Sequence, residues 1–174
     1  SWSLGSQKIV CFGLYISYTF SVASGAGADL RVNGTRLINR LLDLAAIGAI
    51  DGGGCARLAL TDEDQAGRDL VVGWMRDLNL EVSIDVLGNV VGVWNVGSGA
   101  PVMTGSHIDT VRTGGKYDGN LGVLAGLEVI QSMQEHGVSP DRPIAVAFFT
   151  NEEGARFAPD MLGSLVFVGG MSTE

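Results

Sequence analysis

The sequence predicts an α/β fold with helices on both sides of a sheet. Apolar stretches of strand length alternate with amphipathic, helix-forming stretches between residues 34 and 149, which is typical of layered α/β domains. Residues 144–149 are apolar throughout, as in a strand buried on both faces. A glycine-rich segment that carries a histidine and two aspartates, residues 105–118, follows an apolar run. Open α/β sheets bind their ligands at such carboxyl ends of strands.

Residues 1–29 differ from the rest of the chain and are expected to be an N-terminal extension. Lys8 precedes an apolar run at residues 9–20, and small residues follow at 21–28. This is the layout of a secretory signal, and the run is too short for a transmembrane helix. A strand, a disordered extension or sequence foreign to the mature protein are the alternatives.

Two helices are predicted next, on either side of a glycine-rich loop at residues 48–60. Asn33 caps the first helix, residues 34–47. Its apolar face repeats at spacings of four and three residues and consists of Leu37, Leu41 and Leu44. The second helix begins after Thr61, because a capping hydroxyl precedes three acids in the first turn. It runs to about residue 78, and its apolar face consists of Leu70, Val71, Trp74 and Leu78.

The remaining elements follow from periodicity and turn residues. Residues 80–95 are predicted to form a hairpin around Gly88 and Asn89, and residues 101–106 a further strand. The alternating apolar residues of the hairpin's first strand are Leu80, Val82, Ile84 and Val86. A helix is predicted over residues 119–135, in which Gly122 and Gly126 permit close approach to the sheet. Its inward-facing residues are predicted to be Leu121, Leu124, Leu127 and Val129.

The composition limits the classes of function. The chain has 174 residues, 46% of them hydrophobic, which is enough for one domain with a core. Its net charge of −8 argues against nucleic acid and against anionic membranes, because proteins that bind these carry basic surfaces. Cys11 and Cys55 show no CxxC or zinc-finger spacing, so we expect them to be unpaired.

His107 is a candidate metal ligand because Asp109 lies two positions later. A metal-bound imidazole needs an acceptor for its second nitrogen, and a carboxylate can serve. Asp118 follows eleven residues after His107 and can bridge two cations, as in two-metal hydrolases. The alternative is that Asp118 caps the helix that starts near residue 119. The other histidine, His136, lies near a helix end and is expected to be solvated.

The adjacent acids Glu152 and Glu153 follow the buried strand at 144–149. Two neighbouring carboxylates repel each other, and a cation would relieve this repulsion. One acid can then bind the metal while the other accepts a proton from water. The alternative is a solvated loop. Arg156, three residues later, is a weaker candidate for pairing with an acid or with an anionic substrate group.

Two motifs give the chain a resemblance to a known family. GSHIDTVRTGGKYDGNLGV (105–123) and FTNEEGARF (149–157) resemble the amidohydrolase branch of the M20 metallopeptidase superfamily, which contains N-carbamoyl-L-amino-acid hydrolases, β-ureidopropionases and allantoate amidohydrolases. The likeness covers about residues 30–170. The peptidase branch usually has a tryptophan and an Asp-Pro pair around the bridging acid, and GGKYDG stands there in this sequence. That departure favours hydrolases of ureido and amide groups over peptidases.

The resemblance implies a role for each matching residue. His107 would bind one metal ion, Asp118 would bridge two, and Glu153 would bind the second. Glu152 would be the general base, and Asp109 would orient the imidazole. The implied cofactors are two divalent ions, zinc or manganese, with cobalt or nickel as further options. The implied fold is a zinc-peptidase-like (phosphorylase/hydrolase-like) three-layer catalytic domain with a mixed, mostly parallel sheet.

The resemblance also implies that residues 30–174 are an incomplete, N-terminal part of that domain. The family takes further ligands from histidines later in the chain, and no histidine follows His136 here. The expected function is hydrolysis of linear ureido or amide substrates, such as N-carbamoyl amino acids or allantoate, by metal-activated water. The alternatives are an aminoacylase or dipeptidase of the same superfamily, or an inactive truncated copy. The fragment alone is expected to be inactive.

The expected partners are a small-molecule substrate and, in the full-length protein, a second subunit that binds through a domain absent from this sequence. No nucleic acid or membrane partner is expected. The expected location is the cytoplasm, because the resembling enzymes are mostly intracellular, with secretion through a signal at about residues 8–28 as the alternative.

Overall fold

The computed structural model describes residues 30–173, so the predictions for Cys11 and for the extension at 1–29 lie outside the described residues. The elements run along the chain as α1 (Gly34–Ala46), α2 (Asp62–Asp77), β1 (Glu81–Ile84), β2 (Val90–Trp94), β3 (Val102–Ser106), α3 (Asn120–Glu135), β4 (Ile144–Phe148) and α4 (Leu162–Phe167). All but α4 match elements predicted from the sequence. The overall α/β prediction is therefore confirmed for this part of the chain.

The four strands form one mixed sheet in the order β1-β2-β4-β3. β1 pairs antiparallel with β2, and β2 pairs antiparallel with β4, whereas β3 and β4 are parallel. The expectation of a mostly parallel sheet is therefore wrong for the described strands. The β1–β2 hairpin makes the sheet mostly antiparallel, because β2 is antiparallel both to β1 and to β4. Only the β3–α3–β4 crossover produces a parallel pair.

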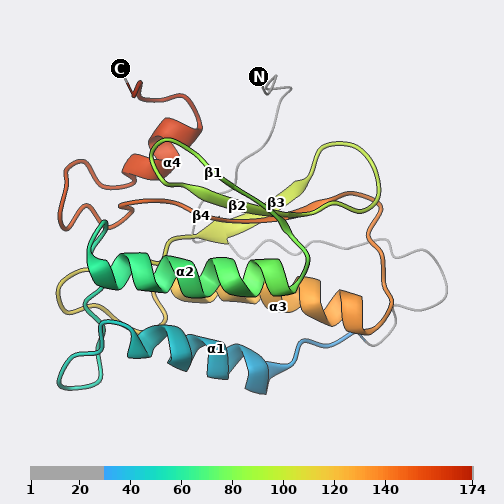
Figure 1. Cartoon of the computed structure of the whole chain (residues 1–174), viewed down its shortest axis with the longest axis horizontal. Helices are drawn as coiled ribbons and strands as arrows, with labels where there is room; N and C mark the ends of the chain where they lie inside the picture. The colour runs from blue at the N-terminus through green and yellow to red at the C-terminus, as the bar shows by residue number, and fades with distance from the viewer. Residues whose placement is uncertain (1–29, 174) are drawn as a thin grey trace.

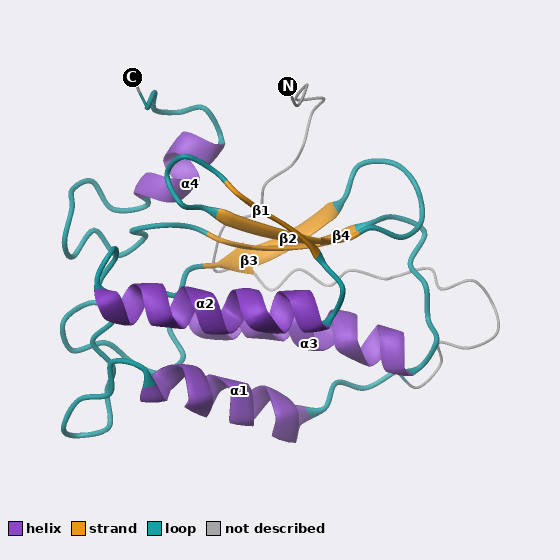
Figure 2. Cartoon of the chain, viewed as in Figure 1, coloured by secondary structure: helices purple, strands orange, loops and turns teal. Residues whose placement is uncertain are grey.

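The helices α2 and α3 lie side by side against one face of the sheet, and α1 packs against them from outside (Figures 1 and 2). Helix α4 lies on the opposite side, near one end of the strands (Figure 2). Its Phe167 makes an edge-on contact with Phe149, with ring centroids 5.2 Å apart. The predicted covering of both faces is therefore seen only at that end of the described sheet.

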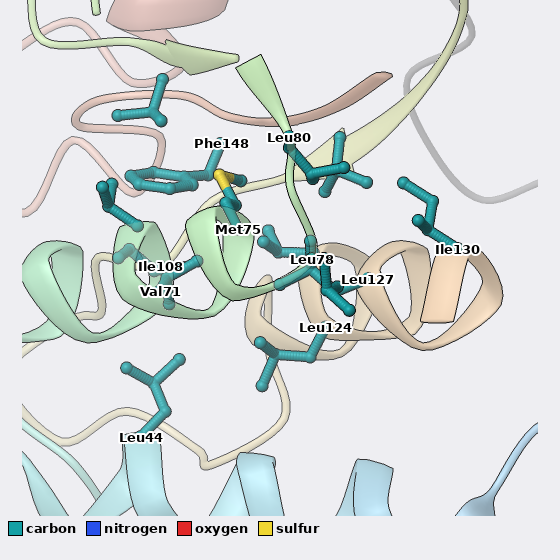
Figure 3. Close-up of a cluster of buried hydrophobic side chains, with 14 of the residues drawn as sticks. Leu44, Val71, Met75, Leu78, Leu80, Ile108, Leu124, Leu127, Ile130 and Phe148 are labelled. Carbon is teal, nitrogen blue, oxygen red and sulfur yellow. The ribbon is translucent and has the colours of Figure 1, made fainter. Parts of the chain in front are cut away.

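The apolar core lies between the sheet and helices α2 and α3, and it continues between these two helices and α1 (Figure 3). Leu44 of α1, Val71 and Met75 of α2, and Phe148 of β4 are all fully buried. Strand β4 is buried from Ala145 to Phe148, which confirms the prediction of a strand covered on both faces. It is a central strand with partners on both edges.

The predicted helix caps are present. The Asn33 side chain accepts a hydrogen bond from the N–H of Arg36, and the Thr61 hydroxyl accepts one from the N–H of Asp64. Each cap satisfies a main-chain donor that the first helical turn leaves free. The two capping residues, Asn33 and Thr61, therefore determine where α1 and α2 begin.

Glycines bring α3 close to the sheet, as predicted. A Cβ atom on Gly126 would lie 2.8 Å from the Thr104 side chain and 3.0 Å from that of Val146. One on Gly122 would lie 3.0 Å from the Ser106 Cβ. Any larger residue at these positions would push the helix away from β3 and β4.

Four of the apolar residues predicted to lie on buried faces are exposed. Leu121 and Val129 of α3 are 46% and 41% exposed, and Val123 and Ile130 occupy the buried positions instead. Ile84, the last residue of β1, is 60% exposed, and Val86 lies beyond the end of β1 and is 89% exposed. In α3 apolar residues occur around most of the helix, so the sequence pattern did not single out one face.

A buried ion pair joins α1 to α3. The Glu128 carboxylate is fully buried and accepts hydrogen bonds from Arg36 Nε at 2.7 Å and Arg36 Nη2 at 2.8 Å. The Asn33 N–H and the Ser132 hydroxyl donate to the same carboxylate at 2.8 and 2.9 Å. Burial alone would raise the pKa of Glu128, but these hydrogen bonds and the charge of Arg36 outweigh it and lower that pKa.

Two further predictions can be compared with the described residues. Cys55 is a free, buried thiol, as expected. His136 ends α3 on the surface, and its Nδ1 lies 2.8 Å from the Ser132 carbonyl oxygen.

Within residues 30–173, every helix is too short or too polar to cross a membrane.

Candidate active site

The site lies where the parallel strands β3 and β4 end together. Ser106 is paired with Phe148 in the sheet, and the N–H of Phe149 donates to the Ser106 carbonyl oxygen at 2.9 Å. His107 therefore leaves β3 beside the segment that carries Glu152 out of β4. The two strand ends that carry the candidate residues therefore lie side by side.

His107 is buried, with 1% of its surface exposed. Its Nδ1 atom lies 2.9 Å from the main-chain carbonyl oxygen of Asp109. A carbonyl oxygen can only accept a hydrogen bond, so Nδ1 is the donor in this contact and Nε2 is the nitrogen left to face the rest of the site. Donation from Nδ1 to a carbonyl oxygen is the arrangement required of an imidazole that binds a metal through Nε2.

Asp109 contacts the imidazole through its main chain, and its side chain accepts hydrogen bonds from the segment after β4. The nearer carboxylate oxygen of Asp109 lies 3.7 Å from His107 Nδ1. The two oxygens accept the N–H groups of Glu152 at 3.2 Å and Glu153 at 3.3 Å. Burial raises the pKa of Asp109, although these hydrogen bonds and His107 oppose the change. Asp109 thus ties the end of β3 to the two acids that follow β4.

Two carboxylates approach the free nitrogen of His107. Glu152 Oε2 lies 3.3 Å from Nε2, and Asp118 Oδ1 lies 4.0 Å from the same atom. A carboxylate oxygen can only accept a hydrogen bond, so an unprotonated Nε2 would face both acids lone pair to lone pair. A proton or a cation between them is needed to make this arrangement favourable.

Burial is the main influence on the two adjacent glutamates. It raises the pKa of Glu152 and of Glu153, while His107 lowers both. The carboxylates of Asp109 and Asp118 raise the two pKa values further, and Glu152 adds to the effect on Glu153. A bound cation would therefore reduce the repulsion among these carboxylates.

Asp118 does not cap α3, so that alternative is wrong. The N-cap residue is Gly119, which makes no side-chain hydrogen bond, and the Asp118 side chain is 69% exposed. Gly119 has a positive φ of 64°, and a Cβ atom there would lie 2.5 Å from His107 Nε2. The turn thus brings Asp118 towards the imidazole only because residue 119 has no side chain.

The side chains of His107, Asp118 and Glu153 are of the types that bind divalent cations. They do not surround a single point in this structure. Imidazole nitrogen and carboxylate oxygen are ligands that zinc and manganese share. Within residues 30–173, no three histidine, cysteine, aspartate or glutamate side chains converge closely enough to hold a metal ion. His107 and Asp118 would hold one ion and Asp118 and Glu153 another, with each set short of a complete coordination shell.

Arg156 contacts main-chain carbonyl groups and an aromatic ring in the described chain, and its part in substrate binding stays a prediction. Its Nη1 donates to the main-chain carbonyl oxygens of Ala59 and Leu60, and its guanidinium lies 4.9 Å from the centre of the Phe157 ring. These contacts tie the loop after β4 to the loop before α2. They give Arg156 a structural role in the described chain.

Sequence reasoning missed Asn151, which directly precedes Glu152. It is buried with a positive φ of 55°, and its Nδ2 donates to the carbonyl oxygen of Phe157 at 2.7 Å. Asparagine tolerates this left-handed conformation better than most residues. An asparagine between the apolar run at residues 144–149 and the acidic pair was the available signal. It also missed Arg57, a fully buried arginine in the predicted loop at residues 48–60.

Comparisons with known proteins match the region of the chain that contains these residues. Residues 89–173 match the model of Peptidase family M28. The N-carbamoyl-L-amino acid amidohydrolase of Geobacillus stearothermophilus is 44% identical over 145 residues, which cover 82% of this chain and 36% of the relative. The ureidoglycolate hydrolase of Oryza sativa subsp. japonica is 36% identical over 149 residues, which cover 84% of this chain and 31% of the relative.

Solved structures give the same result. The crystal structure of a hydantoinase/carbamoylase family amidase from Burkholderia ambifaria superposes with a TM-score of 0.79 at 50% identity. The match covers 82% of this chain and 36% of that one. The chain thus spans about a third of the length of the curated relatives that it matches. On these likenesses, the chain belongs to the M20/M28-like zinc-peptidase family of amidohydrolases.

Proposed function

We propose that the whole protein hydrolyses non-peptide C–N bonds in linear ureido or amide compounds. The substrate class is N-carbamoyl amino acids, with ureidoglycolate and allantoate as close chemical relatives. The observation that carries this proposal is the approach of Glu152 and Asp118 to the free nitrogen of His107, at 3.3 and 4.0 Å. Relatives named for N-carbamoyl amino acids and for ureidoglycolate match this same region.

His107, Asp118 and Glu153 are proposed to hold two divalent ions, zinc or manganese. Such ions, when bound, polarise a carbonyl group and lower the pKa of water towards about 7. The protonated Nδ1 of His107 fixes the imidazole with Nε2 turned towards the carboxylates. Asp109 holds the main chain of Glu152 and Glu153 in place.

Glu152 is proposed to be the general base. Its side chain is partly exposed, at 23%, so it can reach both solvent and the shared edge of β3 and β4. Burial and the neighbouring acids raise its pKa, which makes the carboxylate a stronger base near neutral pH. After taking a proton from water, it can return that proton to the nitrogen that leaves when the C–N bond breaks.

The test is release of ammonia by the whole protein from N-carbamoyl amino acids, compared with cleavage of dipeptides. Turnover of the carbamoyl compounds, abolished by a chelator and restored by zinc or manganese, is the expected result. Faster cleavage of dipeptides would instead indicate an aminoacylase or dipeptidase. No turnover of either substrate class by a metal-loaded protein would indicate an inactive copy.

The Glu152→Gln variant tests the assigned base. It is expected to keep its metal content and to lose about 10²–10⁴-fold in kcat, the usual contribution of general-base catalysis. Glu63→Gln, at an exposed position in the first turn of α2, is the matched control and should be fully active. A Glu152→Gln variant with more than half the wild-type activity would refute the assignment.

A further inference from the structure

Arg57 is a buried cation whose hydrogen bonds all go to neutral groups in the described chain. It is fully buried, and its Nε donates to the Ile108 carbonyl oxygen at 2.8 Å. Its Nη2 donates to the Asn120 side-chain oxygen at 3.1 Å. Its Nη1 lies within hydrogen-bond distance of the carbonyl oxygens of Leu44 and Ile47 and of the Cys55 sulfur.

Two of these acceptors stand at opposite ends of the loop that carries the metal ligands. Ile108 directly follows His107, and Asn120 lies two residues after Asp118. Asn120 is itself fixed, because it is fully buried and its Nδ2 donates to the Lys116 carbonyl oxygen at 3.0 Å. One planar guanidinium therefore spans from the residue beside His107 to the start of α3.

The main chain of Arg57 is anchored to the same loop. Its N–H donates to the Thr110 hydroxyl at 2.7 Å, and its carbonyl oxygen accepts from the Thr110 N–H at 2.8 Å. Cys55 and Gly114 exchange a further pair of main-chain hydrogen bonds at 3.0 and 2.9 Å. Residues 55–57 thus form a short extended support along the ligand loop.

The fold leaves space specifically for this side chain. A Cβ atom on Gly67 of α2 would lie 2.7 Å from the Arg57 Cδ. Burying a cation without a carboxylate partner is costly, and an apolar side chain of similar volume would fill the space at lower cost. The retained guanidinium therefore indicates a role that depends on its directional hydrogen bonds.

We propose that Arg57 is a positioning residue that fixes the separation of His107 and Asp118. Lysine could not replace it, because an ammonium group is a point donor and cannot reach both ends of the loop in one plane. This inference rests on the proposed function, because the purpose of the separation is to hold a metal ion between these two ligands.

The experiment compares the whole protein with Arg57→Lys, Asn120→Ala and a control, Arg36→Met. Arg36 also bridges α1 and α3, but through Glu128 and Glu135, so its loss weakens the same helix pair without touching the ligand loop. The measurements are zinc affinity by chelator competition, the visible absorption of the cobalt-substituted protein, hydrogen exchange of residues 107–120, and kcat and KM.

Arg57→Lys and Asn120→Ala are expected to lower zinc affinity about 10–100-fold, as loss of partners behind metal ligands usually does. Both should shift the cobalt absorption, speed exchange in residues 107–120 and lower kcat more than KM. Arg36→Met should lower the melting temperature and leave the cobalt absorption unchanged. Asn120→Ala alone carries the test if Arg57→Lys does not fold, because it removes one hydrogen-bonded amide and keeps the cation.

Wild-type zinc affinity and cobalt absorption in both variants, with only a lowered melting temperature, would overturn the inference. A wild-type protein that binds zinc without cleaving ureido compounds would overturn the proposed function alone, and the cobalt and affinity measurements would still decide the role of Arg57. A wild-type protein that binds neither zinc nor cobalt would overturn both.

Discussion

A carboxylate oxygen of Asp109 accepts the main-chain N–H of Glu152 at 3.2 Å, although 43 residues separate them in the chain. Its other oxygen accepts the N–H of Glu153 at 3.3 Å. The two acids that follow β4 are therefore placed by a residue that follows β3. This contact joins the halves of the site without any metal.

Replacing Asp109 by asparagine is expected to disturb both halves. The new NH2 group would face one of the two N–H donors and leave it unsatisfied, which costs about 1–3 kcal/mol in the free energy of unfolding. Zinc affinity should fall about 10–100-fold. Urea titration and chelator competition measure these effects, with the exposed Asp51→Asn as control. Equal zinc affinity in the two variants would contradict the role given to Asp109.

Gly119→Ala is expected to displace the His107 imidazole, because the added Cβ would lie 2.5 Å from Nε2 and the φ of 64° disfavours alanine. Crowding of this kind usually costs about 1–3 kcal/mol, and metal binding should suffer in addition. The control is Gly115→Ala in the same loop, where a Cβ atom meets nothing within 4 Å. Calorimetric titration with zinc should distinguish the two variants; indistinguishable binding would show that the imidazole has room to move.

The pair of Arg36 and Glu128 predicts a pH dependence of stability. The pKa of Glu128 is lowered in the folded chain, so its contribution is present above the ordinary pKa of glutamate and is lost as the pH falls through the lowered value. Arg36→Met should cost about 3 kcal/mol, the low end for breaking a buried pair, because Asn33 and Ser132 still donate to the carboxylate.

Unfolding by urea between neutral and acidic pH measures this effect. The stability difference between wild type and Arg36→Met should shrink as the pH falls below the ordinary glutamate range. Arg76→Met, at an exposed position in the last turn of α2, is the control and should change stability by less than about 0.5 kcal/mol. A difference that stays constant over the whole acidic range would refute the assigned linkage.

Residues 30–174 on their own are expected to bind zinc weakly and to show no hydrolysis. His107 and Asp118 offer two protein donors to one ion, and Asp118 and Glu153 offer two to the other, whereas catalytic zinc sites usually have three. Calorimetry with zinc and an ammonia-release assay on N-carbamoyl amino acids test this directly. Two tightly bound zinc ions with measurable turnover would show that these residues already hold a complete site.

Much of the fold and the central residues of the site were predictable because their signals are local. Asn33 and Thr61 begin helices through their own side chains, His107 directly follows β3, and Glu152 lies four residues after the end of β4. The sheet directions were not predictable, because the antiparallel pairing of β2 with β4 is decided by packing between distant segments.

Arg57 illustrates why the rest of the site could not be predicted. An arginine after a run of glycines has the pattern of a solvated loop residue, and its burial depends on acceptors from α1, the ligand loop and α3. Gly119 gave no local signal for a different reason. Residue 119 must lack a side chain because the His107 imidazole lies against it, and this contact exists only in the folded chain.

The central position of β4 has a consequence for how the protein is made. Among the described strands β4 comes last in the chain, yet it lies between β2 and β3. While the chain emerges from the ribosome, the β1–β2 hairpin and β3 have no strand to join them until residues 144–148 appear. We therefore expect α1 to β3 to remain an open, aggregation-prone intermediate during synthesis. The pairing of β3 with β4 and the meeting of His107 with Glu152 would then be completed in a single late step.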